Sequence, residues 1–213
     1  MVILGLTGSI GMGKTTAAKV FRILGVAVHD ADKAVHKLME PGGAACDAVL
    51  AAFPGVEKNG VIDRQALGTQ VFGERAALQK LENILHPLVR KMQTAFLCNA
   101  ARRGEKLVVL DIPLLLETGG EVRCDAVVVV SAPAVIQKQR VLARTGMTRE
   151  RLSAILDKQV ADREKRRMAD FVVKTGLSRA HSLRQIVNIV RVTKSWRPRQ
   201  WSPANNSKRD IRF

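Results

Sequence analysis

The stretch GSIGMGKTT, residues 8–16, closely follows the apolar run VILGL at residues 2–6. It fits the pattern G-x-x-x-x-G-K-[ST] at the required spacing, through Gly8, Gly13, Lys14 and Thr15. Glycines let a backbone approach an anion and turn successive N–H groups into one concave surface. The lysine can reach phosphates, and the threonine hydroxyl can ligate Mg²⁺. The stretch therefore predicts a loop that binds a nucleoside triphosphate, but it does not say which group receives the phosphate.

Short apolar runs alternate with segments of helical spacing along the chain. The predicted strands are residues 2–6, 26–30, 106–111, 125–130 and 171–174. The predicted helices are residues 14–24, 31–39, 44–53, 64–72, 75–103, 133–144, 149–167 and 178–193. This order predicts an α/β fold, a five-stranded parallel sheet flanked by helices, as in P-loop nucleoside triphosphate hydrolases.

The long stretch between the second and third predicted strands needs a separate account. Residues 32–103 are too many for a simple crossover, so we expect a helical subdomain on the substrate side. Within it, His86-Pro87 predicts a kink or a new helix start, because proline lacks a backbone N–H. Residues 54–62 are predicted to be a loop, and Asp63 can cap the helix that follows.

Length and composition limit the class of protein. The 213 residues suffice for one domain, with or without a small insert. No apolar run approaches the ~18 residues of a membrane span, so no membrane partner is expected. The cysteines Cys46, Cys98 and Cys124 are far apart and form no C-x-x-C pair. That usage predicts a reduced, cytoplasmic location with thiols as small apolar groups.

The net charge of +16 is larger than a phosphate-rich substrate requires, so attraction to nucleic acid is the other interpretation. Part of the excess lies in residues 194–213, which we predict to be a basic and mostly disordered extension. Trp196 and Trp201 alternate with arginines there. These rings could stack on bases or pack on the domain surface.

Aspartates follow two of the predicted strands, where ligands of open parallel sheets bind. Asp32 comes just after the second strand and could accept the proton of an acceptor hydroxyl. Asp30 could share that position or cap the next helix. Asp111 ends the third strand, where it could hold Mg²⁺ or form a turn before Pro113.

Basic side chains follow the fourth predicted strand. Gln137, Arg140 and Arg144 share one helix face, and an arginine there could stabilise the transferred phosphoryl group. A solvated helix face is the alternative for them. Solvation is the favoured interpretation for three further arginines, Arg163, Arg166 and Arg167. Glu117 could cap a helix or pair with an arginine, and a lone His86 is more typical of packing or capping.

Six segments, taken together and in order, resemble the dephospho-CoA kinase family. They are LTGSIGMGKTT (6–16), VHDADKAVHKLMEPG (28–42), ILHPLVR (84–90), LDIPLLLE (110–117), QKQRVLAR (137–144) and the Q…ADFVV segment (159–173). The resemblance extends from residue 3 to about residue 193. It implies a nucleotide-kinase fold of residues 1–193, with an acceptor insert at about 32–103 and a lid at about 137–167. The tail at 194–213 has no counterpart in it.

The resemblance also implies a reaction and a set of roles. ATP would phosphorylate the 3′-hydroxyl of dephospho-CoA, with Mg²⁺, to give coenzyme A and ADP. The catalytic residues would be Asp32, Lys14 and Arg140. The phosphates of ATP would lie on Gly8, Ser9, Ile10, Gly11, Met12, Gly13, Lys14, Thr15 and Thr16. The acceptor would lie near Asp32, His86, Pro87, Leu88 and Arg144, and the metal near Thr15 and Asp111.

One segment departs from the family pattern. Family members commonly carry Asn or Asp just after the last strand, near the adenine, whereas this chain has Lys174-Thr175. The resemblance therefore assigns no adenine contacts. Two other functions stay open from the residues alone. One is a related kinase that acts on a nucleoside monophosphate or on shikimate. The other is a P-loop protein associated with nucleic acid, with aromatics at only 4% of the chain against it.

Overall fold

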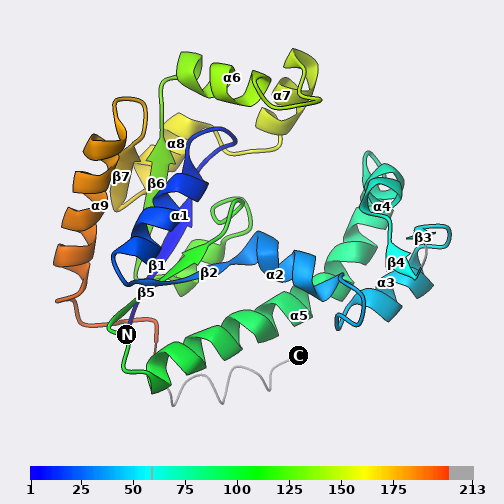
Figure 1. Ribbon diagram of the computed structural model, residues 1–213, viewed down its shortest axis with the longest axis horizontal. Coiled ribbons are helices and arrows are strands. Elements are labelled where there is room, and N and C mark those ends of the chain that lie inside the picture. The colour runs from blue at the N-terminus through cyan, green and yellow to red at the C-terminus, as the bar shows by residue number, and fades with distance from the viewer. Residues whose placement is uncertain (59, 202–213) are drawn as a thin grey trace. The chain divides into compact units, whose positions relative to one another are not determined.

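The computed structural model describes residues 1–58 and 60–201, and the chain divides into two compact units. The first unit comprises Met1–His29 together with the chain from Cys98 onward, and the second comprises Asp30–Leu97. Figure 1 shows the course of the chain. Each unit is described by itself below.

The first unit is built on a five-stranded sheet with the order β2-β5-β1-β6-β7 (Figure 1). Its strands are β1 (Val2–Thr7), β2 (Ala27–Asp30), β5 (Leu107–Asp111), β6 (Ala126–Ser131) and β7 (Phe171–Lys174). Strand β1 pairs in parallel with β5 and β6, and β6 pairs in parallel with β7. Every residue of β1, β5 and β6 is buried, as expected where helices cover both faces. The predicted fold class is confirmed.

Helices α1 (Lys14–Ile23) and α9 (Arg179–Thr193) pack side by side against the sheet (Figure 1). Phe21 of α1 and Ile186 of α9 are fully buried in the same core cluster as β1 and β6. Burying one such side chain contributes about 1.5–3 kcal/mol. Ser178 begins α9 by accepting a hydrogen bond from the N–H of His181. The other helices of this unit are α6 (Ala134–Leu142), α7 (Arg149–Leu156), α8 (Asp162–Met168) and the 3₁₀ helix η1 (Gly120–Arg123).

The prediction of one helix over residues 149–167 is wrong. Helix α7 ends at Leu156 and α8 begins at Asp162, with non-helical residues between them. In that gap the Gln159 side chain accepts a hydrogen bond from a backbone N–H of the glycine loop, and the Val160 N–H donates to Glu117. These bonds to distant parts of the chain replace the hydrogen bonds of a continuous helix, and helical periodicity cannot reveal them.

The second unit has its own core. Its elements are α2 (Ala31–Leu38), α3 (Cys46–Ala52), β3 (Glu57–Lys58), β4 (Val61–Ile62), α4 (Arg64–Val71) and most of α5 (Arg75–Arg102). Val49, Phe53 and Leu85 are buried together at its centre. The Asp63 side chain accepts two backbone hydrogen bonds at the start of α4, which confirms the predicted cap. The predicted loop at 54–62 contains the antiparallel pair β3–β4 instead.

Helix α5 runs without interruption through Pro87, so no new helix starts there. Proline removes one backbone hydrogen bond from a helix interior, which costs about 3 kcal/mol. The neighbouring Leu85 is buried, and Leu88 packs against the same core. Packing of the apolar face of α5 therefore outweighs the local penalty that suggested a new helix start.

Part of the predicted basic extension packs on the first unit. The Trp196 ring lies 5.8 Å from that of Phe171 and contacts the main core cluster. Asp125 accepts hydrogen bonds from the N–H groups of Arg199 and Gln200 through one oxygen, and from Ile3 through the other. For Trp196, packing on the domain is thus the interpretation that holds. Residues 202–213 lie outside the described part of the chain, and so does the disorder predicted for them.

Cys46 and Cys124 are buried, as predicted for thiols that act as apolar groups. Burial raises the pKa of Cys124 to about 12, so this thiol stays protonated at neutral pH. Among residues 1–58 and 60–201, no helix is long and apolar enough to cross a membrane.

Candidate active site

The glycine loop joins β1 to α1, as its motif requires. Gly11 and Gly13 adopt left-handed backbone angles, with φ of 77° and 96°. Gly13 precedes α1, and no acidic residue lies in the first turn of that helix. The N–H groups at the start of a helix carry partial positive charge, so this end of α1 attracts anions. Thr15 and Thr16 are exposed there.

Gly11→Ala is expected to lower the free energy of unfolding by about 1–3 kcal/mol from its left-handed angle alone, with a further loss from a clash. A Cβ at Gly11 would lie 2.5 Å from Val141 Cγ2 and 3.1 Å from the carbonyl oxygen of Gln137. Gly25→Ala is the matched control, because Gly25 has a similar φ of 74° and open space around it. Urea unfolding of both variants measures the difference. Equal losses would contradict the predicted clash.

Lys14 and Asp111 form the charged centre of the loop. Strand β5 lies beside β1, and its last residue places the Asp111 carboxylate 2.6 Å from Lys14 Nζ. Asp111 is only 3% exposed and Lys14 16%. A buried pair of this kind keeps each charge in place, since either partner alone would lose its compensation. Asp111 thus lies beside the loop, and the alternative of a simple turn residue does not account for this contact.

Arg140 projects from α6 onto the loop. Its guanidinium donates to the carbonyl oxygen of Gly11 at 3.4 Å and to the Thr175 hydroxyl and carbonyl at 3.2 and 2.7 Å. The Thr175 hydroxyl donates to the Met12 carbonyl at 2.5 Å. The position that departs from the family pattern therefore supports the loop itself. Arg144, predicted on the same helix face, lies beyond the end of α6 and is exposed.

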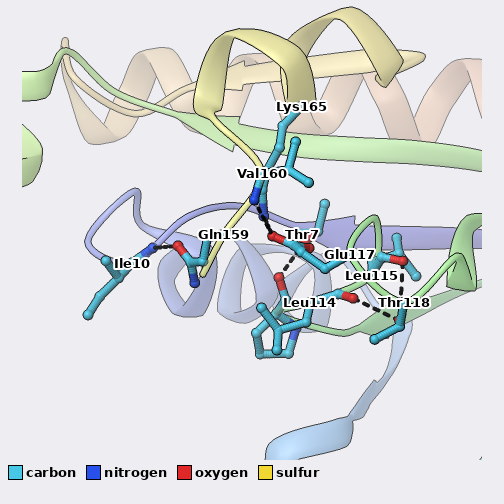
Figure 2. Close-up of polar contacts among 10 residues, drawn as sticks. Thr7, Ile10, Leu114, Leu115, Glu117, Thr118, Gln159, Val160 and Lys165 are labelled. Carbon is cyan, nitrogen blue, oxygen red and sulfur yellow. Dashed lines mark hydrogen bonds and ion pairs between the residues drawn. The ribbon is translucent and has the colours of Figure 1, made fainter. Parts of the chain in front are cut away.

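Contacts of Gln159, Glu117 and Lys165 lie near the loop (Figure 2), and sequence reasoning assigned no role to Gln159 or Lys165. Gln159 Oε1 accepts from the Ile10 N–H at 3.1 Å. Glu117 pairs with Lys165 at 2.7 Å, and not with an arginine, which was one of the two roles predicted for it. Gln159 lies in one of the six segments that carry the family resemblance, and this was the only signal in the sequence that pointed to it. Arg166 and Arg167 form exposed pairs within α8, as expected for a solvated face.

The remaining predicted site residues belong to the second unit. Asp30 caps α2 by accepting a hydrogen bond from the Lys33 N–H, which resolves its role in favour of the cap. Asp32 follows in the first turn of α2 and is exposed. His86 and Pro87 are exposed on α5, whereas Leu88 is half-buried against the core of the unit.

Suitability for a metal can be judged from the donor atoms. Thr15 offers an exposed hydroxyl and Asp111 a carboxylate, which are the oxygen ligands that Mg²⁺ prefers. The described residues contain no cluster of three or more His, Cys, Asp or Glu able to hold a metal alone. These donors therefore fit an ion that obtains most of its ligands from phosphates and water, as Mg²⁺ does in kinases.

Comparisons with known proteins agree on one family. Residues 2–179 match the family model described as dephospho-CoA kinase. The chain is 60% identical over 176 residues to the dephospho-CoA kinase of Mesorhizobium japonicum, covering 83% of this chain and 88% of that protein. It is 63% identical over 166 residues to that of Paramagnetospirillum magneticum, covering 78% of each chain.

Solved structures that resemble this chain include a dephospho-CoA kinase. The protein TT1252 of Thermus thermophilus superposes with a TM-score of 0.80 at 34% identity, covering 90% of this chain and 96% of that one. Dephospho-CoA kinase from Campylobacter jejuni gives 0.60 at 27% identity with the same coverage. A shikimate kinase from Acinetobacter baumannii gives 0.52 at 17% identity, which shows a shared fold alone.

Proposed function

This chain belongs to the dephospho-CoA kinase family, and on that premise we propose how its residues carry out the reaction. It is an ATP-dependent phosphotransferase of the last step in coenzyme A synthesis. In the proposed reaction, a ribose 3′-hydroxyl oxygen forms a bond to the γ-phosphorus of ATP. The bond from that phosphorus to the bridging oxygen breaks, and ADP leaves.

The observation that carries this proposal is the arrangement of the glycine loop. The positive end of α1, the Lys14–Asp111 pair and the Arg140 guanidinium all lie at one loop within the first unit. Phosphoryl transfer depends mainly on positioning and on stabilising charge that spreads over the phosphoryl oxygens. Residues 8–16 supply main-chain donors, and Lys14 and Arg140 supply the charge. Arg140 now bonds to Gly11 and Thr175, so we expect it to move toward the phosphate in the complex.

Thr15 and Asp111 would hold Mg²⁺, directly or through water. The ion supplies charge neutralisation at the phosphates. Thr15→Val keeps the shape of the side chain but removes its hydroxyl. We expect about a tenfold higher Mg²⁺ requirement in Thr15→Val, and near-normal behaviour in Thr15→Ser. Titrating Mg²⁺ after treatment with a chelator measures both. Full turnover in the chelated, metal-free enzyme would contradict the assignment.

Asp32 would act as the base that accepts the proton of the acceptor hydroxyl. Asp32 is exposed in the first turn of α2, and its neighbour Asp30 serves as the cap of that helix. We propose that the second unit is the acceptor-binding insert, with His86, Pro87 and Leu88 near the acceptor. Its separate core supports a distinct role. The lid would comprise residues 137–167, and Arg144 would reach the acceptor from it.

The test is ADP release from Mg·ATP with dephospho-CoA as acceptor. AMP, CMP, adenosine and shikimate run in parallel, with Lys14→Ala as the blank. Turnover with dephospho-CoA alone is the expected result. Turnover only with another acceptor would overturn the substrate and keep the fold. Contact with nucleic acid through the basic tail and a cytoplasmic location remain predictions.

A further inference from the structure

The main chain of Ile10, at the tip of the glycine loop, is held from both sides. Its N–H donates to Gln159 Oε1 at 3.1 Å, and its carbonyl oxygen accepts from Gln137 Nε2 at 2.8 Å. Gln137 is buried and belongs to α6, whereas Gln159 lies between α7 and α8. A loop with glycines on both sides of its tip has many accessible backbone conformations. Side-chain contacts of this kind select one of them.

The segment that carries Gln159 is itself fixed by a buried carboxylate. Glu117 Oε1 accepts from the Val160 N–H at 3.0 Å and lies 2.7 Å from Lys165 Nζ. The Lys165 side chain is 0% exposed. Replacing a buried ion pair by apolar side chains is often neutral for stability, so stability alone does not explain this pair. Instead, Glu117 Oε1 connects Lys165 of helix α8 with Val160, the residue next to Gln159.

Glu117 lies in the segment that follows β5, and this segment also contacts the start of the glycine loop. The Thr7 hydroxyl, on a residue that is 0% exposed, donates to the carbonyl oxygen of Pro113 at 2.8 Å. Thr7 directly precedes the loop, and Glu117 lies four residues after Pro113. The contacts therefore form a closed ring from Thr7 through Glu117 and Gln159 back to Ile10 (Figure 2).

We propose that Gln159 is a positioning residue of the glycine loop, held in place by the buried Glu117–Lys165 pair. Gln159 keeps the Ile10 N–H engaged before nucleotide arrives, so the remaining loop amides are already aligned for phosphate. This inference rests on the proposed function only in assigning the loop to ATP. Misplacing a binding group by about 1 Å can reduce a rate about 100-fold, so the effect should extend to catalysis.

The first experiment compares Gln159→Met with Gln139→Met. Methionine has a similar shape but no comparable acceptor, and Gln139 is an exposed glutamine of α6. In Gln159→Met without ligand, we expect the Ile10 amide hydrogen to exchange at least about tenfold faster. The KM for ATP should rise about tenfold and kcat should fall several-fold. The KM for dephospho-CoA should stay within about twofold, because the loop is assigned to ATP. Gln139→Met should leave the exchange of the Ile10 amide hydrogen as in the wild type, because the Ile10 main chain bonds to Gln159 and Gln137 and not to Gln139.

An unchanged exchange rate of the Ile10 amide hydrogen in Gln159→Met would show that the hydrogen bond to Gln159 does not protect it, and would overturn the proposal. Faster exchange with unchanged ATP kinetics would overturn the positioning role. A merely structural role would lower thermal stability and leave the ratio of the two KM values unchanged, which also contradicts the proposal. Exchange at Ile10 and ATP affinity by calorimetry need no acceptor. They therefore test this inference even if dephospho-CoA proves not to be the substrate.

The second experiment isolates the Glu117 acceptor from its charge. Glu117→Gln with Lys165→Met keeps an oxygen for the Val160 N–H, whereas Glu117→Met with Lys165→Met does not. Neither variant leaves a buried charge unpaired, so both should fold. We expect the Ile10 amide hydrogen to exchange fast when both Glu117 and Lys165 are replaced by methionine. It should stay protected when Glu117 is replaced by glutamine and Lys165 by methionine. Equal exchange in the two variants would overturn the link between Glu117 and the loop.

Discussion

Lys14→Met is expected to reduce the turnover of dephospho-CoA by about 10³-fold, because it removes a positive charge from the phosphate site. The change also leaves Asp111, which is 3% exposed, without its 2.6 Å partner. Removing one member of a buried pair costs about 3–5 kcal/mol, and the partial exposure of Lys14 favours the lower end. ADP release measures turnover, and thermal unfolding measures stability.

Two further variants separate the loss of activity from the loss of stability. Lys14→Met with Asp111→Asn also removes the buried negative charge that Lys14 compensates, so it should regain much of the stability and none of the turnover. Lys19→Met removes an exposed lysine from the same helix and should match the wild type. Near-normal turnover in Lys14→Met would contradict the role of the loop.

Asp32→Asn is expected to reduce kcat by about 10²–10⁴-fold while ATP still binds, because an amide cannot accept the hydroxyl proton. The effect on folding should be small. Asp32 is exposed in the first turn of α2, where a negative charge contributes about 0.3–1 kcal/mol. Single-turnover rates and ATP affinity by calorimetry give the two quantities.

Asp47→Asn is the matched control for Asp32→Asn. Asp47 is also an exposed acidic residue in the first turn of a short helix, α3, of the same unit. Both variants should lose similar small amounts of stability, and only Asp32→Asn should lose turnover. A kcat for Asp32→Asn within about threefold of the wild type would remove the base assignment, since general-base catalysis is worth far more.

The sequence predicted well what depends on near neighbours. The glycine loop, its flanking strand and helix, and the cap at Asp63 all follow from spacing over a few residues. The five strands were also predicted, because each is a short apolar run in a sheet covered on both faces. The gap at 157–161 was missed, and the new helix start that Pro87 suggested is absent from the predicted helix. Both depend on partners far along the chain.

The sequence by itself predicted triphosphate binding, because a motif of nine residues carries its own geometry. The alternation of apolar runs and helical segments predicted the parallel sheet. Only the tertiary structure decided which side chains meet at the loop. Lys14 meets Asp111 across 97 residues because β5 lies beside β1. Gln159 meets Ile10 across 149 residues because it lies in the non-helical segment between α7 and α8. Such contacts arise from strand order and helix ends, which local periodicity does not encode.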